Sequence, residues 1–453
     1  MSITKSIETL FQKYLPTPFV IAILLTFVTI ILALVFTDNP SREPHLFMVL
    51  SYWEAGIWNE DLLVFAYQMM LILVLGHVLC LSQPVARALD KVTVYATSTA
   101  KAVVLVSLST MLVAFFNWGL GLIFGAIFAR KIGEASLKRG IAINYPLIGA
   151  AGYVGLMVWH GGMSGSAPLK VAESGHMASL MQDIASPAFI SQLPDRITDG
   201  QTIFSPSNLI IFGLLLVLVP LILYTLSRKA KPTTLPAFGD DFNQSSSLEK
   251  EHRMDRSKIL GIGVAIVILL TFYITYWGKS LTPNMLNFCM LGLGILLHGN
   301  FKNFRNAVEK AIGGASGILI QFPLYFGIMG IMKSTGMVTL ISDGFVSFAT
   351  QTTLPIFTFI SAGIVNVFVP SGGGQWAIQG PIIIESASSL GVPLPKAIMA
   401  MAYGDQITNM LQPFWALPLL GITKLKAKEI LPYTLIVMLV GALVFIGGLL
   451  LFY

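Results

Sequence analysis

The sequence Val369-Pro370-Ser371-Gly372-Gly373-Gly374-Gln375-Trp376 interrupts an apolar stretch that runs from residue 354 to residue 389. A second apolar stretch, 102–129, is interrupted in the same way at Asn117-Trp118-Gly119. These lengths are awkward for full helical crossings of a bilayer, which take about 20 residues each. The 102–129 stretch is long for one crossing and short for two. A re-entrant helical hairpin, which enters and leaves the membrane on the same side, fits best.

The composition supports a membrane setting for these hairpins. Of 453 residues, 55% are hydrophobic and only 11% are charged, and the mean hydropathy is +0.77. Soluble domains carry about 25% charged residues. With only two cysteines, the chain is neither a disulfide scaffold nor an ordinary soluble enzyme. Because the apolar runs are continuous rather than alternating, they predict an all-α polytopic membrane protein and not a barrel.

Nine further segments have the length and character of full spans, some of them tilted or broken. They are 17–37, 62–82, 142–168, 207–226, 259–277, 283–298, 316–332, 397–420 and 431–452. The first lacks a small-residue cleavage site after it, so we expect a retained helix rather than a signal peptide.

The positions of the 28 lysines and arginines indicate the topology. If the N-terminus is cytoplasmic, most of these basic residues fall in cytoplasmic segments, as the positive-inside rule requires. Hairpins, or full pairs of crossings, preserve this bias, whereas counting 102–129 as one crossing inverts it. We therefore attribute the net charge of +6 to topology and expect no nucleic-acid partner.

The chain divides into two halves with matching parts, 1–226 and 259–453, joined by a polar cytoplasmic linker at 227–258. Each half has a glutamine in a span (Gln68, Gln321), then an asparagine near a hairpin tip (Asn117, Asn366), then a broken span. The breaks lie at 161–168 and 404–413, and the two units enter the membrane from opposite sides. Inverted repeats with interrupted helices are typical of secondary transporters, whose sites lie where the breaks meet.

The interruptions supply polar groups suited to a small ion pair. Freed backbone groups in the membrane need partners, and the interruptions carry mostly neutral oxygen donors, as a weakly held monovalent cation requires. These are Asn117, Ser164, Ser166, Asn366, Ser371, Asp405, Gln406, Thr408, Asn409 and Gln412. We find no lysine or arginine at the interruptions, so an anion must be held by helix ends, amides and hydroxyls. This favours a monovalent anion.

Structural readings of the same residues stay open. Glycine-rich breaks can be surfaces for close helix packing. Asp405 is the only acidic residue inside a full span, which makes it a functional hypothesis by default, but it could also have a purely structural partner. His160 directly precedes the first break, where it is either a gate or site residue or a packed neutral histidine. For His77, the packed neutral histidine is the better interpretation. Nothing resembles a nucleophile with its base or a metal cluster, so we expect no enzyme activity.

Four motifs at these interruptions resemble the bacterial short-chain fatty acid transporter family, within the wider ion transporter superfamily. The motifs are Phe116-Asn117-Trp118-Gly119-Leu120-Gly121-Leu122, Gly161-Gly162-Met163-Ser164-Gly165-Ser166, Val369 to Pro381, and Ala402-Tyr403-Gly404-Asp405-Gln406 continuing to Gln412-Pro413-Phe414-Trp415-Ala416-Leu417-Pro418. The resemblance covers nearly the whole chain. It implies an inner-membrane symporter for acids such as acetoacetate and butyrate, with a scaffold domain and a transport domain that moves like an elevator.

The resemblance, taken with the interruptions, assigns two groups of site residues. Substrate-binding residues are Ser164, Ser166, Ser371, Gly372, Gly373 and Gln375. Coupling-ion residues are Asn117, Asn366, Asp405, Thr408 and Asn409. The coupling ion is Na⁺ or H⁺, with no other metal and no cofactor expected, and the superfamily implies a homodimer. Competing hypotheses are a transporter of dicarboxylates or another small organic anion, a passive channel, and a membrane enzyme acting on fatty acids.

Overall fold

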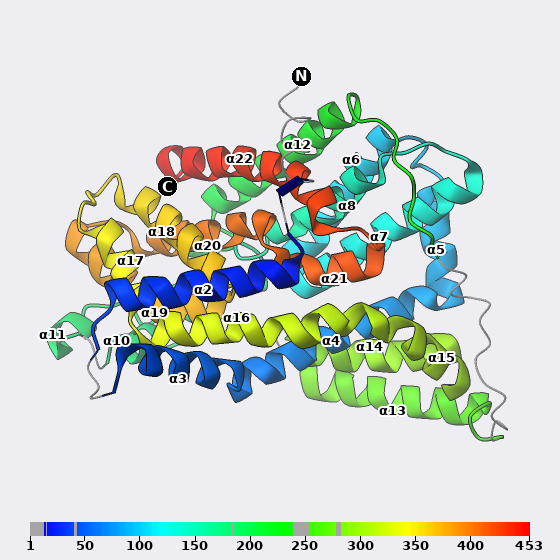
Figure 1. Cartoon of the computed structure of the whole chain (residues 1–453), viewed down its shortest axis with the longest axis horizontal. Coiled ribbons are helices and arrows are strands. Elements are labelled where there is room, and N and C mark those ends of the chain that lie inside the picture. Colours follow the sequence, from blue (N-terminus) through cyan, green and yellow to red (C-terminus); the bar gives the residue numbers. More distant parts are fainter. Residues whose placement is uncertain (1–12, 15, 40–42, 183–184, 239–252, 278–281) are drawn as a thin grey trace.

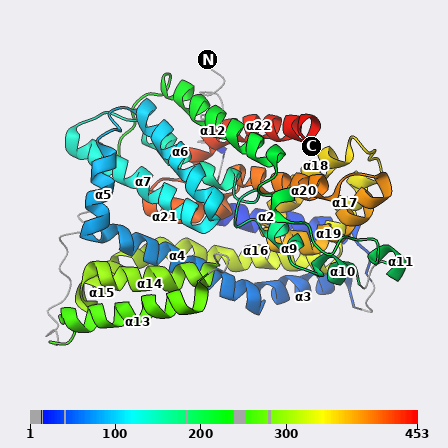
Figure 2. The same cartoon turned by 180° about the vertical axis from the view of Figure 1, so that it is seen from behind.

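The computed structural model describes residues 13–14, 16–39, 43–182, 185–238, 253–277 and 282–453. All regular secondary structure within these ranges is helical. Many of the helices run along the long axis of the molecule (Figures 1 and 2). The predicted polar linker, 227–258, lies partly outside the described residues, because 239–252 are not among them.

The helices of the first half begin after polar capping residues in several cases, for example Asn59, Ser98, Asn117 and Asn144, whose side-chain oxygens accept a backbone N–H three residues later. In chain order these helices are α2 (Pro18–Phe36), α3 (His45–Ile57), α4 (Glu60–Leu81), α5 (Gln83–Thr93), α6 (Thr99–Phe116), α7 (Trp118–Arg139), α8 (Tyr145–Tyr153), η1 (Val154–Met157), α9 (Ser166–Val171), α10 (His176–Met181), α11 (Pro187–Ile190), η2 (Asp199–Gln201) and α12 (Pro206–Ser227).

The second half repeats this order in outline. Its helices are α13 (Lys258–Tyr276), α14 (Pro283–His298), α15 (Phe301–Ala311), η3 (Ile312–Ala315), α16 (Ser316–Ser334), α17 (Met337–Val346), α18 (Leu354–Phe368), α19 (Gly372–Leu390), α20 (Leu394–Thr408), η4 (Asn409–Leu411), α21 (Pro413–Thr423) and α22 (Ala427–Leu451). Each of the nine predicted spans therefore contains a helix or a broken helix.

Seven described helices are long and apolar enough to cross a membrane: Pro18–Phe36, Leu62–Leu79, Thr99–Phe116, Pro206–Ser227, Lys258–Tyr276, Phe301–Ser334 and Ala427–Leu451. The shorter apolar helices include Tyr145–Met157, Pro283–His298, Leu354–Phe368 and Pro413–Thr423. The short ones belong mainly to the broken spans and to the second hairpin, so interruption rather than polarity limits their length.

The packing of the helices matches between the two halves. α6 packs on α8 and η1 as α18 packs on α20, and α7 packs on α21 as α19 packs on α9. The helices that precede the hairpins, here called the leading helices, pack on the other half of the chain. α2 and α3 lie along α16, and α14 lies along α4. These relations confirm the predicted fold of inverted repeats with two helical hairpins and two broken helices.

The first hairpin is longer than the predicted 102–129, because α7 continues to Arg139. Arg130 and Lys131, which directly follow the predicted hairpin in the sequence, belong to α7 and are buried, with 5% and 8% exposure. Their side chains lie 2.8 and 3.0 Å from the carboxylate of Glu134, one turn further on. Because these charges are paired, they do not end the helix, which stops at the left-handed Gly140 (φ 66°).

The prediction missed several helices of lower hydropathy. α3 packs along α16 within the bundle, and α5 and α15 are short helices with basic residues. α5 and α15 lie at the same end of the molecule (Figure 1). Their polar faces lower the mean hydropathy, so a search for apolar runs does not find them.

Candidate functional site

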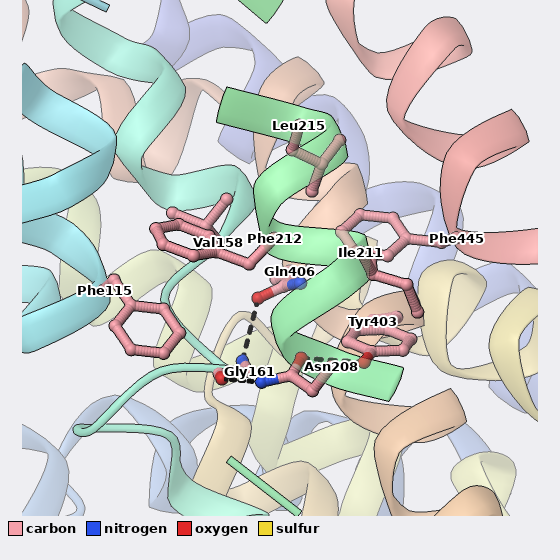
Figure 3. A pocket seen from close by; sticks show the side chains of 10 residues that line it. All are labelled: Phe115, Val158, Gly161, Asn208, Ile211, Phe212, Leu215, Tyr403, Gln406 and Phe445. Carbon is pink, nitrogen blue, oxygen red and sulfur yellow. Dashed lines mark hydrogen bonds between the residues drawn. The ribbon is translucent and has the colours of Figure 1, made fainter. Parts of the chain in front are cut away.

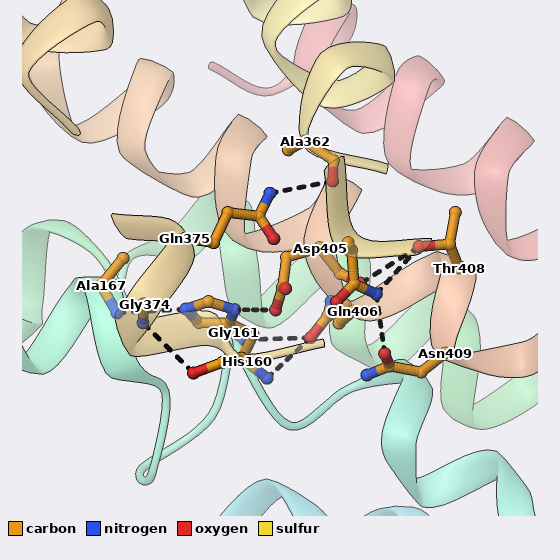
Figure 4. Close-up of polar contacts among 12 residues, drawn as sticks. His160, Gly161, Ala167, Ala362, Gly374, Gln375, Asp405, Gln406, Thr408 and Asn409 are labelled. Atoms are coloured by element: carbon orange, nitrogen blue, oxygen red, sulfur yellow. Dashed lines mark hydrogen bonds and ion pairs between the residues drawn. The ribbon is translucent and has the colours of Figure 1, made fainter. Parts of the chain in front are cut away.

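The two broken helices meet at their interruptions, where a histidine and an aspartate form a buried pair. η1, which follows α8, packs against η4, which follows α20. His160 in the first break and Asp405 on α20 are 0% and 1% exposed. The Nδ1 atom of His160 is hydrogen-bonded to Oδ2 of Asp405 (Figure 4). The pair joins one half of the chain to the other.

The hydrogen bonds of His160 define its protonation. The backbone N–H of Ala167, at the start of α9, donates to Nε2 of His160 at 3.1 Å (Figure 4). Because a backbone N–H cannot accept, Nε2 carries no proton, and the neutral ring must carry its proton on Nδ1. His160 therefore donates to Asp405, and it links α20 to the helix that follows the first break.

The freed backbone of the first break finds partners in other elements. Oε1 of Gln406 accepts the N–H groups of His160 and Gly161 at 2.8 and 3.1 Å. The Gly161 carbonyl accepts from Nδ2 of Asn208 on α12 at 2.8 Å, and Asn208 in turn accepts from Tyr403 at 2.8 Å. Gly161, Asn208, Tyr403 and Gln406 line a small cavity (Figure 3), whose volume is about 10 Å³. This space is too small for an organic acid, so we interpret it as packing that fixes the break.

Four of the five predicted coupling-ion residues lie together in the second half. Nδ2 of Asn366, in the last turn of α18, donates to the Asp405 carbonyl at 2.6 Å, to Oγ1 of Thr408 at 2.9 Å and to Oδ1 of Asn409 at 2.8 Å. The Asn366 carbonyl accepts from Nε2 of Gln412. Within the described residues, Oδ1 of Asn366 and Oε1 of Gln412 are buried and have no hydrogen-bond partner.

Such unpartnered buried oxygens are rare and call for an explanation. Uncharged carbonyl oxygens together with a nearby carboxylate are the donors that a hard cation such as Na⁺ prefers. The residues around Asn366 therefore fit a monovalent cation, with Oδ1 of Asn366 and Oε1 of Gln412 as the available ligands.

The fifth residue, Asn117, lies at the tip of the first hairpin and uses its side chain differently. Its Oδ1 accepts the N–H of Leu120 at 2.9 Å and so caps α7. The tip is fastened to its own break: the Trp118 N–H donates to Oγ of Ser164 at 2.9 Å, and the Met163 N–H donates to the Phe115 carbonyl at 2.7 Å. These bonds stabilise the first hairpin and do not join it to the residues around Asn366.

A cavity of about 680 Å³ lies between the hairpin tips. Five of the six predicted substrate residues line it: Ser164, Ser166, Ser371, Gly372 and Gly373. Gly372 approaches the His160–Asp405 pair closely, since a Cβ there would lie 2.8 Å from Cε1 of His160. These five predicted residues are thus far apart in the chain but border one cavity.

Gln375, the sixth predicted substrate residue, is not among the residues that line this cavity. It is fully buried behind the tip of the second hairpin. Its Nε2 donates to the Ala362 carbonyl at 2.8 Å and to Oε1 of Gln379 at 2.7 Å. In this structure Gln375 connects α19 to α18 rather than facing the cavity.

Two kinds of residue in the cavity wall were not predicted from the sequence. One is an aromatic group composed of Phe65, Trp118, Trp159 and Trp415; the other is a charged group composed of Lys170, Glu173 and Asp199. Lys170 corrects our expectation that no basic side chain lies near the interruptions. It follows Ser166 by four residues, which is one helical turn, and this spacing was the available signal.

The comparison with protein families identifies the chain. The family described as short chain fatty acid transporter matches residues 1–452. The chain belongs to this family. Membership makes it a transporter and not an enzyme, as expected from the absence of a catalytic motif in the sequence.

Two relatives of this transporter are similar over almost their whole length. A protein of Haemophilus influenzae is 36% identical over 99% of this chain and 98% of its own. A protein of Escherichia coli K12 is 35% identical over 97% of each chain. Both are named as candidate short-chain fatty acid transporters.

Two solved structures, each 14% identical in sequence, also match over most of the chain. The YdaH transporter of Alcanivorax borkumensis matches 95% of this chain and 98% of its own, with a TM-score of 0.45. MtrF of Neisseria gonorrhoeae, described with a class of antimetabolite efflux pumps, matches 98% of this chain and 97% of its own, with a TM-score of 0.36.

Proposed function

We propose that this transporter carries short-chain monocarboxylates such as acetoacetate and butyrate, coupled to Na⁺ or H⁺, by alternating access in a bacterial inner membrane. The observation that supports the proposal most is the cavity of about 680 Å³. It is bordered by both hairpin tips, by the first break and by Trp415 after the second break. Secondary transporters place their substrate at such a junction of broken helices.

The cavity wall has a polar part that suits one carboxylate. The hydroxyls of Ser166 and Ser371 lie beside Gly372 and Gly373 at the start of α19. The positive end of a helix dipole and nearby hydroxyl donors stabilise an anion without a basic side chain. We therefore assign the carboxylate of the substrate to this part of the wall.

The aromatic part of the wall suits a short apolar chain. The rings of Trp118 and Trp415 are 5.2 Å apart, and Phe65 on α4 lies 6.3 and 6.2 Å from them. These rings come from a leading helix, a hairpin tip and a half-helix. Burying one or two methylene groups against them gains about 0.8 kcal/mol each.

A co-transported cation offsets the charge of the substrate. If it is Na⁺, the oxygens of Asn366 and Gln412 are the proposed ligands, with Asp405, Thr408 and Asn409 around them. If it is H⁺, Asp405 is the proposed acceptor, because it is the carboxylate of the buried pair. Buried ionisable residues inside membrane proteins commonly mark such pathways.

We further propose an elevator movement, in which hairpins and broken helices carry the cavity past the leading helices α2, α3, α4, α14 and α16. The two breaks are hydrogen-bonded to each other through His160, Asp405 and Gln406, which supports movement of both broken helices as one unit. The proposed orientation has a cytoplasmic N-terminus, since α5 and α15 with their basic residues then face the cytoplasm.

Exchange of substrate across proteoliposomes tests the function. Vesicles loaded with unlabelled butyrate should take up labelled acetoacetate or butyrate faster than protein-free vesicles do. Protein-free vesicles are an essential control because the neutral forms of these acids cross lipid. Strong competition by succinate or citrate would instead favour a transporter of dicarboxylates or other anions, and failure to exchange any short-chain acid would reject the proposal.

A further inference from the structure

Three charged side chains line the cavity beyond its serines and glycines. Lys170, on α9, lies with Nζ 3.0 and 3.1 Å from the two carboxylate oxygens of Glu173. Asp199, at the start of η2, is the third. One ammonium and two carboxylates leave a net negative charge in a cavity that we assign to an anion.

The ammonium of Lys170 is occupied by its partner. The side chains of Lys170 and Glu173 are 51% and 57% exposed, so both remain in contact with water. Among the described residues that line the cavity, Lys170 is the only basic one. While Glu173 holds it, the cavity offers no free cationic side chain to a ligand.

Asp199 adds a second carboxylate, one oxygen of which has no hydrogen-bond donor among the described residues. This oxygen, Oδ1, is buried. A carboxylate oxygen without a hydrogen-bond donor repels other anions in the same space. The charged part of the cavity is therefore unfavourable for a negative ligand group.

We propose that Glu173 and Asp199 make the transporter selective for monocarboxylates over dicarboxylates, Glu173 by neutralising Lys170. The inference rests on the proposed function and adds the residues that determine substrate rank. The single carboxylate of butyrate binds at the serines and glycines, with its chain on the aromatic rings. The second carboxylate of succinate must lie elsewhere in the same cavity, where Glu173 and Asp199 repel it.

The substitution Glu173→Gln tests this reading by a gain of function. It removes one negative charge and leaves Lys170 free to pair with a second carboxylate. Exchange in proteoliposomes gives kcat/KM for succinate and for butyrate. We expect the ratio of succinate to butyrate to rise about fivefold at low ionic strength, the size expected for an exposed ion pair, and the gain to shrink in high salt.

Two further variants identify the cause of that gain. In the double variant Lys170→Gln with Glu173→Gln, the ratio should fall below that of Glu173→Gln, because no ammonium remains for the second carboxylate. Glu385→Gln is the matched control, since Glu385 is an exposed acid on α19 that is not among the residues lining the cavity. It should leave the ratio at the wild-type value.

Asp199→Asn should raise the ratio by itself, through loss of repulsion. The inference is overturned if neither Glu173→Gln nor Asp199→Asn changes the ratio, or if the wild-type protein exchanges succinate as well as butyrate. The first result leaves monocarboxylate transport in place, whereas the second also favours a transporter that accepts dicarboxylates. If the wild-type protein exchanges none of these acids, the proposed function itself fails, so the two failures are distinguishable.

Discussion

The two repeats have the same order of parts, but their asparagines make different bonds. In the first repeat, Oδ1 of Asn117 caps α7 by accepting the Leu120 N–H at 2.9 Å. In the second, Nδ2 of Asn366 donates to three oxygens on α20 and η4, while its Oδ1 has no partner among the described residues. The side-chain oxygen of Asn117 is therefore hydrogen-bonded within its own hairpin, whereas that of Asn366 is available to a ligand.

This difference suggests that the repeats have specialised. The first break supplies Ser164 and Ser166 to the cavity wall, and the second repeat supplies a buried polar group with spare oxygens. The His160–Asp405 bond connects the two. We therefore expect one joint site for substrate and cation rather than two equivalent sites.

The largest effect is expected for Asp405→Asn. The amide oxygen can still accept the Nδ1–H of His160, so the protein should fold and reach the membrane. Loss of the carboxylate should abolish cation-dependent uptake. Uptake into proteoliposomes with imposed Na⁺ or H⁺ gradients measures this, with immunoblotting for expression. Unchanged uptake with unchanged cation dependence would remove Asp405 from the coupling site.

The next comparison is between Asn366→Ala and Asn117→Ala. Loss of Asn366 should raise the cation concentration for half-maximal uptake by about tenfold or more, as expected for a residue of an ion site. Loss of Asn117 should lower the free energy of unfolding by about 1 kcal/mol, because a helix cap is removed, and should leave the cation requirement unchanged. An equal rise in both variants would place the first tip in the cation site, as the sequence predicts.

A smaller effect separates two neighbouring glycines of the second hairpin. A Cβ on Gly372 would lie 2.8 Å from ring atoms of both His160 and Trp159, whereas a Cβ on Gly373 would meet only Ser166, at 3.9 Å. Overpacking of this kind costs about 1–3 kcal/mol. Gly372→Ala should therefore slow exchange, measured per folded protein, while Gly373→Ala stays near the wild-type rate. Equal rates in both would contradict the close contact.

The smallest effect concerns the outer attachment of the second hairpin. Nε1 of Trp376 donates to Nε2 of His176 at 3.0 Å, so His176 is neutral there. Partial burial, and then the nearby Lys170, lower the pKa of His176 from its usual 6.5. Because the folded form disfavours the proton, the attachment is intact above pH 6.5 and weakens as the pH falls below it.

Limited proteolysis of the segment after α9 measures this attachment. Cleavage should be faster at acidic than at neutral pH in the wild-type protein. His176→Gln keeps an acceptor for Trp376 but does not titrate, so its cleavage corrects for the pH dependence of the protease. If the two proteins respond identically to pH, the His176 attachment does not control the segment.

The interruptions of the helices could be predicted from the sequence because their signals are local. Glycine, proline and asparagine within apolar runs marked both hairpins and both breaks, and Asp405 was conspicuous as a carboxylate inside a span. The expected symmetry of the two hairpin tips predicted the positions of their asparagines but not the roles of these side chains. It paired Asn117 with Asn366 by spacing but could not predict which amide would cap its own helix.

Contacts between distant segments could not be predicted. His160 and Asp405 are 245 residues apart, and nothing near either residue indicates the other. In α7, Arg130 and Lys131 are paired with Glu134. From the sequence alone, three charged residues so close together indicate the end of a buried helix. Lys170 could not be placed beside the interruptions from the sequence, because the cavity that it lines exists only in the folded protein.

Protection of a cysteine in the cavity wall shows whether the substrate binds there. In a protein with Cys80 and Cys289 replaced by serine, Ser166→Cys would place one thiol in the cavity wall. We expect butyrate and acetoacetate to slow its labelling by a water-soluble thiol reagent at the concentrations that half-saturate exchange, and succinate to do so much less. If the same variant exchanges these acids but they leave the labelling rate unchanged, the substrate does not bind in this cavity.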